Sequence, residues 1–216
     1  MTERVYYRDT YLAELEAVVL RSGSDEVGFY FVPDRTIFHA QGGGQPADPG
    51  FVDVDGQKHR VVNLQEEGDE IKHYIDRVIS GKIRLTIDLT ERSLFAKLHS
   101  AGHLLAGVVK ELYPELEGYR GNHFPGGQAF VMFKGNTLPE KDSFKLAVEN
   151  RLAEVIGEAR AIHVNNETSP RLVQIEGFRA YPCGGTHVKN TGELTNLTLR
   201  SIKAQKGELK VGYDIT

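Results

Sequence analysis

The first 86 residues alternate apolar and polar positions in short runs, which is the pattern of half-buried β-strands. Turn-forming pairs such as Asp55-Gly56 and Gly68-Asp69 separate these runs. Strands are expected within residues 17–23, 27–33, 50–56, 59–68 and 69–76. Several short strands at this spacing predict a small barrel or sandwich.

The periodicity changes to that of a helix at Asp88. Asp88 and Glu91 have the spacing of a capping box, with the acid at the N-cap. Apolar residues then recur every three or four positions between Leu94 and Leu112, until Tyr113-Pro114 ends the helix. The pattern therefore predicts one long amphipathic helix.

A second helix is expected from Glu140 to Gly157, and strands are expected again within residues 161–166 and 172–178. A closing hairpin over residues 194–215 should turn near Lys206-Gly207. The whole pattern predicts an α+β protein. Its domains would be residues 1–87, a β domain with a glycine-rich loop, and residues 88–216, an α+β domain.

Charge and cysteine content narrow the functional classes. The 216 residues carry a net charge of −4, which argues against a protein that coats nucleic acid by charge alone. The single cysteine excludes an internal disulfide and favours a reducing compartment. No apolar run could cross a bilayer, and the N-terminus lacks the apolar core of a signal peptide. We therefore expect a cytoplasmic protein without membrane contact.

Two pairs of potential metal ligands stand out. His99 and His103 are four positions apart in the first predicted helix, so their side chains leave the same face one turn apart. Cys183 and His187 have the same spacing in Pro-Cys-Gly-Gly-Thr-His, where two glycines permit a tight loop around an ion. Imidazole and thiolate together favour a borderline-soft metal, so we predict that the four residues bind one zinc ion.

Each pair taken alone has a simpler interpretation. Paired histidines on a helix are often only packed or solvated, and a free cysteine is commonly a buried structural thiol. The single cysteine lying four positions from a histidine, alongside a second such pair, makes coincidence a poor explanation. Four protein ligands would close a tetrahedral site, whereas catalytic zinc sites usually keep one position open. Either one ligand is labile, or the zinc organises a pocket beside which the reaction occurs.

Two further features are less specific. Gly42, Gly43 and Gly44, followed by Gln45, would let a backbone approach a ribose or phosphate closely, or would simply form a hairpin turn. Basic residues near the first helix and near the C-terminus could hold a phosphate backbone, although charged runs are usually solvated faces. These candidate nucleic-acid contacts are Arg92, Lys97, Arg200 and Lys203.

Together the motifs resemble the editing domain of alanyl-tRNA synthetase and its free-standing relatives, the AlaX proteins. Residues 98–105 (LHSAGHLL) are similar to the HxxxH helix of that domain, and residues 182–188 (PCGGTHV) to its second zinc motif. Residues 38–48 (FHAQGGGQPAD) resemble the glycine-rich motif of the preceding β-barrel. The order matches over essentially the whole chain, which is too short for an aminoacylation core. The medium-length AlaX type, AlaX-M, is the best match.

The resemblance implies a small β-barrel followed by an α/β sandwich editing domain. It also implies trans-editing, the hydrolysis of tRNA(Ala) that was wrongly charged with serine and in some cases glycine. His99, His103, Cys183 and His187 would be the zinc ligands, and Gly42 to Gln45 would lie by the groove for the acceptor end. No obligatory protein partner is implied.

The chain departs from the family pattern around the amino-acid pocket. Ser100 stands where the family often has threonine, and Gly102 is smaller than the usual residue. The pocket glutamine has no counterpart in residues 119–123. These departures bear on the choice between serine and glycine. Ser100 is a candidate for contacting the serine hydroxyl, since hydrogen-bonding sites discriminate far better than apolar ones, or it only bonds a helix carbonyl.

Three mechanisms compete. A zinc-bound water with its pKa lowered to about 7, or zinc polarising the ester carbonyl, would perform the hydrolysis, and no side chain is assigned as the base. Cys183 activated by His187 could instead act as a thiol nucleophile, which would leave the other two histidines without a role. The third interpretation is a zinc-stabilised RNA-binding module without catalysis.

Overall fold

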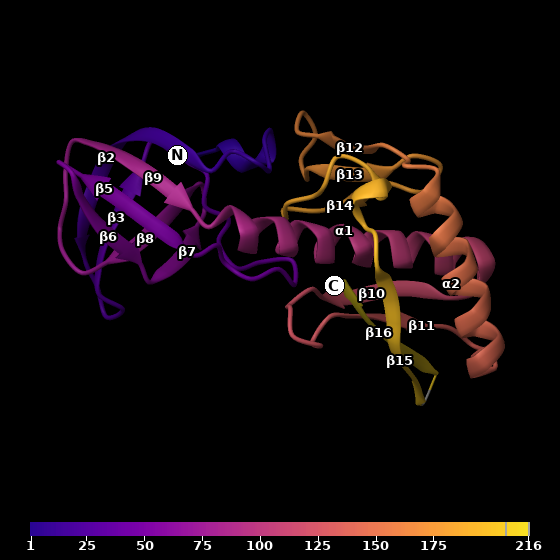
Figure 1. Cartoon of the computed structure of the whole chain (residues 1–216). Coiled ribbons are helices and arrows are strands. Elements are labelled where there is room, and N and C mark those ends of the chain that lie inside the picture. Colours follow the sequence, from indigo (N-terminus) through magenta and orange to yellow (C-terminus); the bar gives the residue numbers. More distant parts are fainter. Residues whose placement is uncertain (206, 216) are drawn as a thin grey trace. The chain divides into compact units, whose positions relative to one another are not determined.

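The computed structural model describes residues 1–205 and 207–215, and the chain is mixed α and β with sheet predominating. It divides into two compact units, coloured along the chain in Figure 1. The first unit comprises Met1–Gly42 and Pro46–Ser93, and the second comprises Gly43–Gln45 and Leu94–Thr216. Gly43–Gln45 therefore belongs to the second unit, although the strands on either side of it in the sequence belong to the first. No helix in the described part of the chain is long and apolar enough to span a membrane.

The first unit is built on one antiparallel sheet of seven strands, in the order β6-β5-β9-β2-β3-β8-β7. A short 3₁₀ helix, η1 (Val5–Tyr7), and a parallel pair, β1 (Glu3–Arg4) with β4 (Arg35–Thr36), accompany it. The strands of the sheet are β2 (Glu14–Ser24), β3 (Phe29–Pro33), β5 (Gly50–Val54), β6 (Gln57–Val61), β7 (Asn63–Glu67), β8 (Glu70–Ile75) and β9 (Lys82–Ile87).

The two edges of this sheet belong to one chain segment. The run expected as a single strand over residues 59–68 is split at Val62, so that β6 pairs with β5 and β7 pairs with β8. The sheet therefore curls in the manner of a half-barrel. Among the described residues no ladder joins β6 to β7, so the closed barrel is not confirmed.

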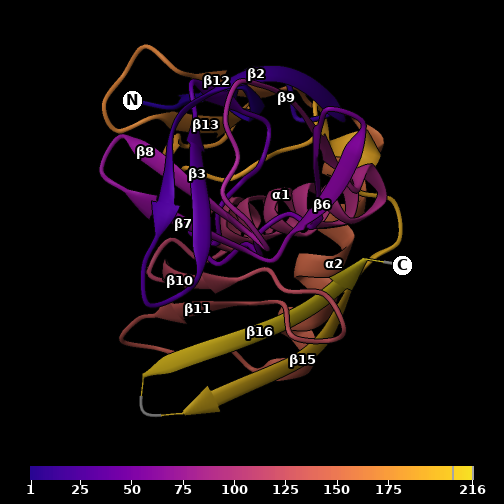
Figure 2. The same ribbon diagram turned by 90° about the vertical axis from the view of Figure 1, so that its left-hand side faces the viewer.

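The second unit contains a four-stranded antiparallel sheet and a smaller three-stranded one. The larger sheet has the order β10 (Glu117–Asn122), β11 (Phe130–Lys134), β16 (Glu208–Ile215), β15 (Leu197–Gln205). The smaller has the order β12 (Ile162–Asn165), β13 (Leu172–Ile175), β14 (Tyr181–Pro182). Helix α1 (Leu89–Leu112) continues through this unit from Leu94 and runs between the two sheets in both views (Figures 1 and 2). Helix α2 (Lys141–Gly157) and a 3₁₀ helix, η2 (Thr191–Glu193), complete it.

Both helices begin where the sequence predicts. Asp88 Oδ1 accepts hydrogen bonds from the N–H groups of Thr90 and Glu91, at 2.9 and 3.2 Å. The carboxylate of Glu140 caps α2 by accepting from two N–H groups of its first turn. The closing hairpin is present as β15 and β16, although Lys206 of its expected turn lies outside the described residues. Strands β9, β10 and β11 were not predicted individually.

The apolar stripe of α1 is buried in a single core of the second unit. Side chains of α2 and of both sheets contribute to this core, including Phe144, Val173 and Val211. Leu104, Leu105 and Val108 of α1 are completely buried in it. Because this packing fixes the rotation of α1, it also fixes where His99 and His103 project.

Candidate metal centre and active site

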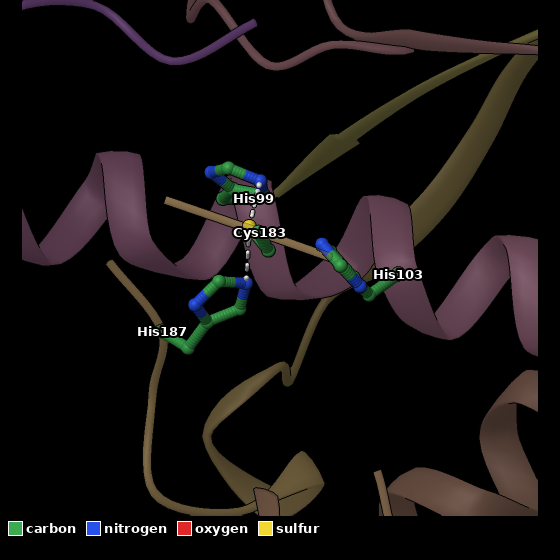
Figure 3. A group of neighbouring side chains, drawn as sticks. All are labelled: His99, His103, Cys183 and His187. Atoms are coloured by element: carbon green, nitrogen blue, oxygen red, sulfur yellow. Dashed lines mark hydrogen bonds between the residues drawn. The ribbon is translucent and has the colours of Figure 1, made fainter. Parts of the chain in front are cut away.

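The structure brings the two predicted ligand pairs together. His99 and His103 project from α1, while Cys183 directly follows β14 and His187 lies four residues further along the same loop (Figure 3). One donor atom from each of the four side chains lies within 4.8 Å of the other three. The group could therefore hold one metal ion.

The contacts of Cys183 with two of the histidines have the spacing of ligands on a tetrahedral zinc ion. Cys183 Sγ lies 3.3 Å from His99 Nε2 and 3.7 Å from His187 Nε2, the contacts dashed in Figure 3. Ordinary zinc–sulfur and zinc–nitrogen bond lengths in a tetrahedron place sulfur and nitrogen about 3.6 Å apart. The residues present thus fit the predicted ion in number and chemistry, and these two distances fit it in spacing.

Burial keeps these histidines in the form that binds metal. It lowers the pKa of His103 to about 4, and it lowers the pKa of His187 well below its usual value. Neutral imidazole is the ligating form, so both rings are ready to bind at neutral pH.

The environment of Cys183 suits a metal ligand better than a free nucleophile. Burial raises the pKa of the thiol, and this outweighs the opposing effects of the Gly185 N–H and of Arg171. A catalytic cysteine instead needs a lowered pKa, usually from a cationic partner. His187, which burial keeps neutral, does not supply one, and this counts against the thiol-nucleophile interpretation.

Gln45 holds His99 in its orientation. Its Oε1 accepts hydrogen bonds from His99 Nδ1–H and from the Thr186 N–H, each at 2.9 Å, while its Nε2 donates to Thr186 Oγ1 at 2.9 Å. Gln45 is completely buried. The expectation that it contacts the substrate is therefore corrected, because both ends of its amide are already bonded. Such partners fix which ring nitrogen of a ligating histidine faces the metal.

Close packing explains the second glycine of the Pro-Cys-Gly-Gly-Thr-His loop. A Cβ atom on Gly185 would lie 2.2 Å from the His99 ring, so no larger residue fits there. Arg171 holds the same loop by donating to the carbonyl oxygens of Cys183 and Gly185, at 2.8 and 2.9 Å. Sequence reasoning missed Arg171, which lies twelve positions before Cys183 and carries no local motif.

Ser100 has a structural role. It is completely buried, and its Oγ accepts a hydrogen bond from the Val188 N–H at 3.1 Å. This bond ties α1 to the loop that carries His187. Ser100 is not among the residues that line the neighbouring pocket, and its contact with the substrate stays a prediction.

A small pocket lies against the ligand cluster and shares His103 with it. Its volume is about 210 Å³, below the roughly 300–1,000 Å³ typical of pockets for drug-sized ligands. The size suits a small amino acid. The lining residues are Gly102, His103, Ala106, Gly118, Tyr119, Arg120, Gly121, His123, Val131, Tyr181 and Pro182.

His123, which sequence reasoning did not single out, is a fourth histidine of this region, beside the three of the ligand cluster. It follows β10 directly, is only 5% exposed, and stacks on His99 with ring centroids 4.4 Å apart. Burial, with a smaller effect from His103, lowers its pKa to about 3, so the ring is neutral. No spacing motif links it to the four ligands, so only the fold reveals it.

The glycine-rich segment is divided between the two units. Gly42 is exposed and belongs to the first unit. Gly43 and Gly44 belong to the second and have φ values of 57° and 78°, which favour glycine. The Gly44 carbonyl accepts from the His123 N–H at 2.8 Å. Within the second unit this segment therefore lies against β10, and a contact of Gly42, Gly43 or Gly44 with substrate stays a prediction.

Arg92 corrects one predicted nucleic-acid contact. Its side chain is completely buried and forms an ion pair with the buried Asp48, with Nε donating to Oδ1 at 2.9 Å. It also donates to the carbonyl oxygens of Thr10 and Ile37. With its donors used inside the first unit, Arg92 has no surface to offer a phosphate.

Two other predicted contacts lie together on the four-stranded sheet. Arg200 and Lys203 are exposed and line a hollow of about 300 Å³ with Lys210 and Phe130. Lys203 lies directly opposite Lys210 in the β15–β16 register, while Arg200 is ion-paired with Asp214 at 2.9 Å. Lys97 is half-buried on α1 and does not line this hollow.

Comparison with known proteins supports the resemblance of the motifs. The family described as the threonyl and alanyl tRNA synthetase second additional domain matches residues 171–209. The alanyl-tRNA editing protein AlaX-M of Methanosarcina mazei is 30% identical over 94% of this chain and 92% of its own length. AlaX-M of Saccharolobus solfataricus is 29% identical over 100% of this chain and 99% of its own length.

Longer proteins match as well. The alanine–tRNA ligase of Ignicoccus hospitalis is 31% identical over 98% of this chain, which spans only 26% of that ligase. The chain thus corresponds to about a quarter of such ligases but to nearly the whole of the AlaX-M proteins. With identity at this level over almost the full length of both, the chain belongs to the family of alanyl-tRNA editing proteins of the AlaX-M type.

Proposed function

We propose that this protein is a trans-editing hydrolase that deacylates tRNA(Ala) mischarged with serine or glycine, with one zinc ion held by His99, His103, Cys183 and His187. The observation that carries the proposal is the meeting of this ligand cluster with a small pocket through His103, which belongs to both. The names of the AlaX-M relatives support the choice of alanyl-tRNA as substrate.

The reaction is hydrolysis of an ester. Water adds to the carbonyl carbon, the bond to the ribose oxygen breaks, and the amino acid and free tRNA leave. The pocket would hold the amino-acid part, since Gly102 and Gly121 keep its walls small. Bound zinc would supply a Lewis acid at the wall of this pocket. The neighbouring ribose hydroxyl could assist the reaction.

Exposed cations near the pocket and on the sheet would hold the tRNA backbone. Arg120 is exposed, lines the pocket, and has no ion-pair partner among the residues that the structure describes. Lys203 and Lys210 are like charges directly opposite each other, an arrangement that destabilises a sheet. A phosphate between them would remove this repulsion, and lysine and arginine side chains are common donors to nucleic-acid phosphates. Lys97 remains a further candidate.

A deacylation assay tests the proposal. The protein would be mixed with seryl-, glycyl- and alanyl-tRNA(Ala), and loss of the ester would be followed against a buffer control. We expect rapid loss of the seryl ester, loss of the glycyl ester, and an alanyl ester that decays as in buffer. Removal of zinc with a chelator should abolish the activity and zinc should restore it. Absence of hydrolysis of both mischarged forms would refute the proposal.

One observation favours a second candidate, a zinc-stabilised RNA-binding module without catalysis. All four ligands come from the protein, which is the pattern of structural zinc sites. The same assay separates the two functions, because this candidate predicts tRNA binding in a gel-shift experiment with no loss of ester from any of the three substrates.

A further inference from the structure

The pocket beside the ligand cluster contains one histidine that is not part of the cluster. His123 lines the pocket and stacks on His99, yet it is absent from the group of four converging donors. Its side chain is held from a different part of the unit, by Tyr213 of β16. The protonation of its two ring nitrogens determines whether His123 offers the pocket a hydrogen-bond donor or an acceptor.

The hydrogen bonds of Tyr213 determine the tautomer of His123. The Tyr213 hydroxyl has one proton, which it donates to the Leu98 carbonyl at 2.9 Å. Its 2.6 Å contact with His123 Nδ1 must then be a bond that Nδ1–H donates. In the neutral ring Nε2 carries the lone pair, and no described residue hydrogen-bonds it. His123 thus brings an unpaired acceptor to a pocket that it lines.

Two glycines make the space for this ring. A Cβ atom on Gly102 would lie 2.4 Å from His123 Cε1 and 2.8 Å from the Tyr213 hydroxyl. A Cβ atom on Gly121 would lie 2.7 Å from both Cε1 and Nε2 of the ring. Gly102 lies inside α1, where glycine weakens a helix relative to alanine. Residues of three elements, α1, β10 and β16, therefore determine together where the His123 ring lies.

The chemistry of the substrates indicates what the acceptor can distinguish. The residues that line the pocket include no aspartate or glutamate, so they offer no counter-charge to an ammonium group. The seryl, glycyl and alanyl esters carry the same α-amino group, so a hydrogen bond to that group would not discriminate among them. A side-chain donor such as a hydroxyl would discriminate. Among small amino acids, serine offers that hydroxyl, whereas glycine and alanine do not.

We infer that His123 is a specificity-determining residue, whose Nε2 accepts a hydrogen bond from the hydroxyl of the seryl group. This inference rests on the proposed function and deepens it. Tyr213 is the positioning residue that keeps Nε2 unprotonated, and Gly102 and Gly121 provide the space. When glycine occupies the pocket, the acceptor is left unpaired, so seryl-tRNA(Ala) is preferred over glycyl-tRNA(Ala).

Substitution of His123 tests the inference through the ratio of kcat/KM for seryl-tRNA(Ala) to kcat/KM for glycyl-tRNA(Ala). With the zinc-loaded protein, we expect His123→Leu to lower kcat/KM for seryl-tRNA(Ala) at least ten-fold and to leave glycyl-tRNA(Ala) within about two-fold. His123→Gln, which keeps an acceptor, should recover part of the loss. Equal losses on both substrates, or an unchanged ratio, would overturn the inference. Thermal unfolding and zinc content would verify that each variant is folded and loaded.

Tyr213→Phe gives a second test that keeps the imidazole and removes one oxygen. It should lower the seryl-to-glycyl ratio at least about three-fold because the tautomer is no longer fixed. It also decides the matter if His123→Leu does not fold, since an unchanged ratio would then refute the inference.

A binding measurement separates this inference from the proposed function. Non-hydrolysable 3′-seryl-amido and 3′-glycyl-amido adenosine would be titrated into the protein by calorimetry. We expect tighter binding of the seryl compound, with the preference lost in His123→Leu. If the wild type keeps this preference but hydrolyses no ester, the proposed function fails and the inference stands. If neither compound binds, or both bind equally, the inference fails.

Discussion

Each unit of the protein contains a buried histidine, and the two histidines differ in what their ring nitrogens contact. In the first unit, His73 uses both ring nitrogens internally, with Nε2 bonded to Thr36 Oγ1 at 2.8 Å and Nδ1 to the Ile71 carbonyl at 3.0 Å. In the second, His99 Nδ1 bonds Gln45 Oε1 at 2.9 Å, while its Nε2 contacts Cys183 Sγ of the ligand cluster at 3.3 Å. Both rings are almost completely buried, so burial alone does not distinguish them.

The comparison shows what separates a site from a polar core. The first unit satisfies its buried polar groups in pairs, as Arg92 and Asp48 also show. In the second unit, Gln45 bonds one ring nitrogen of His99, and the other ring nitrogen lies with the donor atoms of His103, Cys183 and His187. A candidate metal centre is thus recognised by converging donor atoms whose orientation is fixed by a further residue.

Substituting one buried histidine in each unit tests this comparison with the largest expected effect. We expect His103→Ala to reduce deacylation of seryl-tRNA(Ala) at least about 100-fold and to lower zinc content, since a direct ligand should matter more than its supporting residues. His73→Asn should leave kcat/KM within about two-fold. It should lower the free energy of unfolding by about 1–3 kcal/mol, because buried hydrogen bonds are lost. Kinetics and denaturant unfolding of both variants would check this, and the opposite pattern would contradict the comparison.

Loss of the buried Arg92–Asp48 ion pair in the first unit should have the next largest effect, on stability. Arg92→Met should lower the free energy of unfolding by about 3–5 kcal/mol, because it leaves the Asp48 carboxylate buried without a partner. KM for tRNA should not change in the folded protein. Lys203→Gln is the matched surface control, and we expect its stability to stay within about 0.5 kcal/mol. A stable Arg92→Met protein with a raised KM would restore Arg92 as a tRNA contact.

Gln45 tests whether orientation of a ligand matters in the second unit. Gln45→Leu should weaken zinc binding about 10–100-fold, because His99 Nδ1–H and the Thr186 N–H lose their shared acceptor. Gln45→Glu keeps an acceptor for both groups and should retain most of the affinity. Competition titration with a zinc-binding dye would measure both. Equal losses of zinc affinity in the two variants would show that the hydrogen-bond acceptor at position 45 does not determine the affinity.

The pH dependence of zinc affinity sharpens the comparison further. Burial lowers the pKa of His103 to about 4, lowers that of His187 well below its usual value and raises that of Cys183, so at neutral pH these two imidazoles are neutral and the thiol is protonated. Binding should release about one proton, from Cys183, and the affinity should rise about ten-fold per pH unit between roughly pH 6 and 8. A slope near zero, or one of two or more protons, in titrations across this range would contradict these pKa directions.

Much of the fold followed from local signals in the sequence. The cap at Asp88 and the apolar stripes placed both helices correctly, because capping and amphipathic periodicity act within a few residues. Strands β10 and β11 escaped prediction. Their segments, EGYRGN and FVMFK, show no clear alternation bounded by turns, and pairing with β16 rather than local propensity gives them their structure.

The candidate site shows the same limit. The ligand pairs could be found because each has a spacing of four residues, whereas the residues that position them come from distant segments. Gln45 was assigned to the substrate because a glycine-rich loop gives no sign of which side chain turns inward. Ser100 was assigned there because it neighbours a ligand, although its hydroxyl bonds the Val188 N–H. His123 carries no motif, since its environment is assembled by tertiary packing.

The zinc content of the purified protein tests the central claim most directly. After loading with zinc and exhaustive dialysis, inductively coupled plasma mass spectrometry would give the metal per chain for the wild type and for Cys183→Ser, with His73→Asn as the matched control. The account predicts about one zinc per chain in the wild type and in His73→Asn, with a clear loss in Cys183→Ser. A wild type without zinc, or a Cys183→Ser protein that retains it fully, would contradict the account.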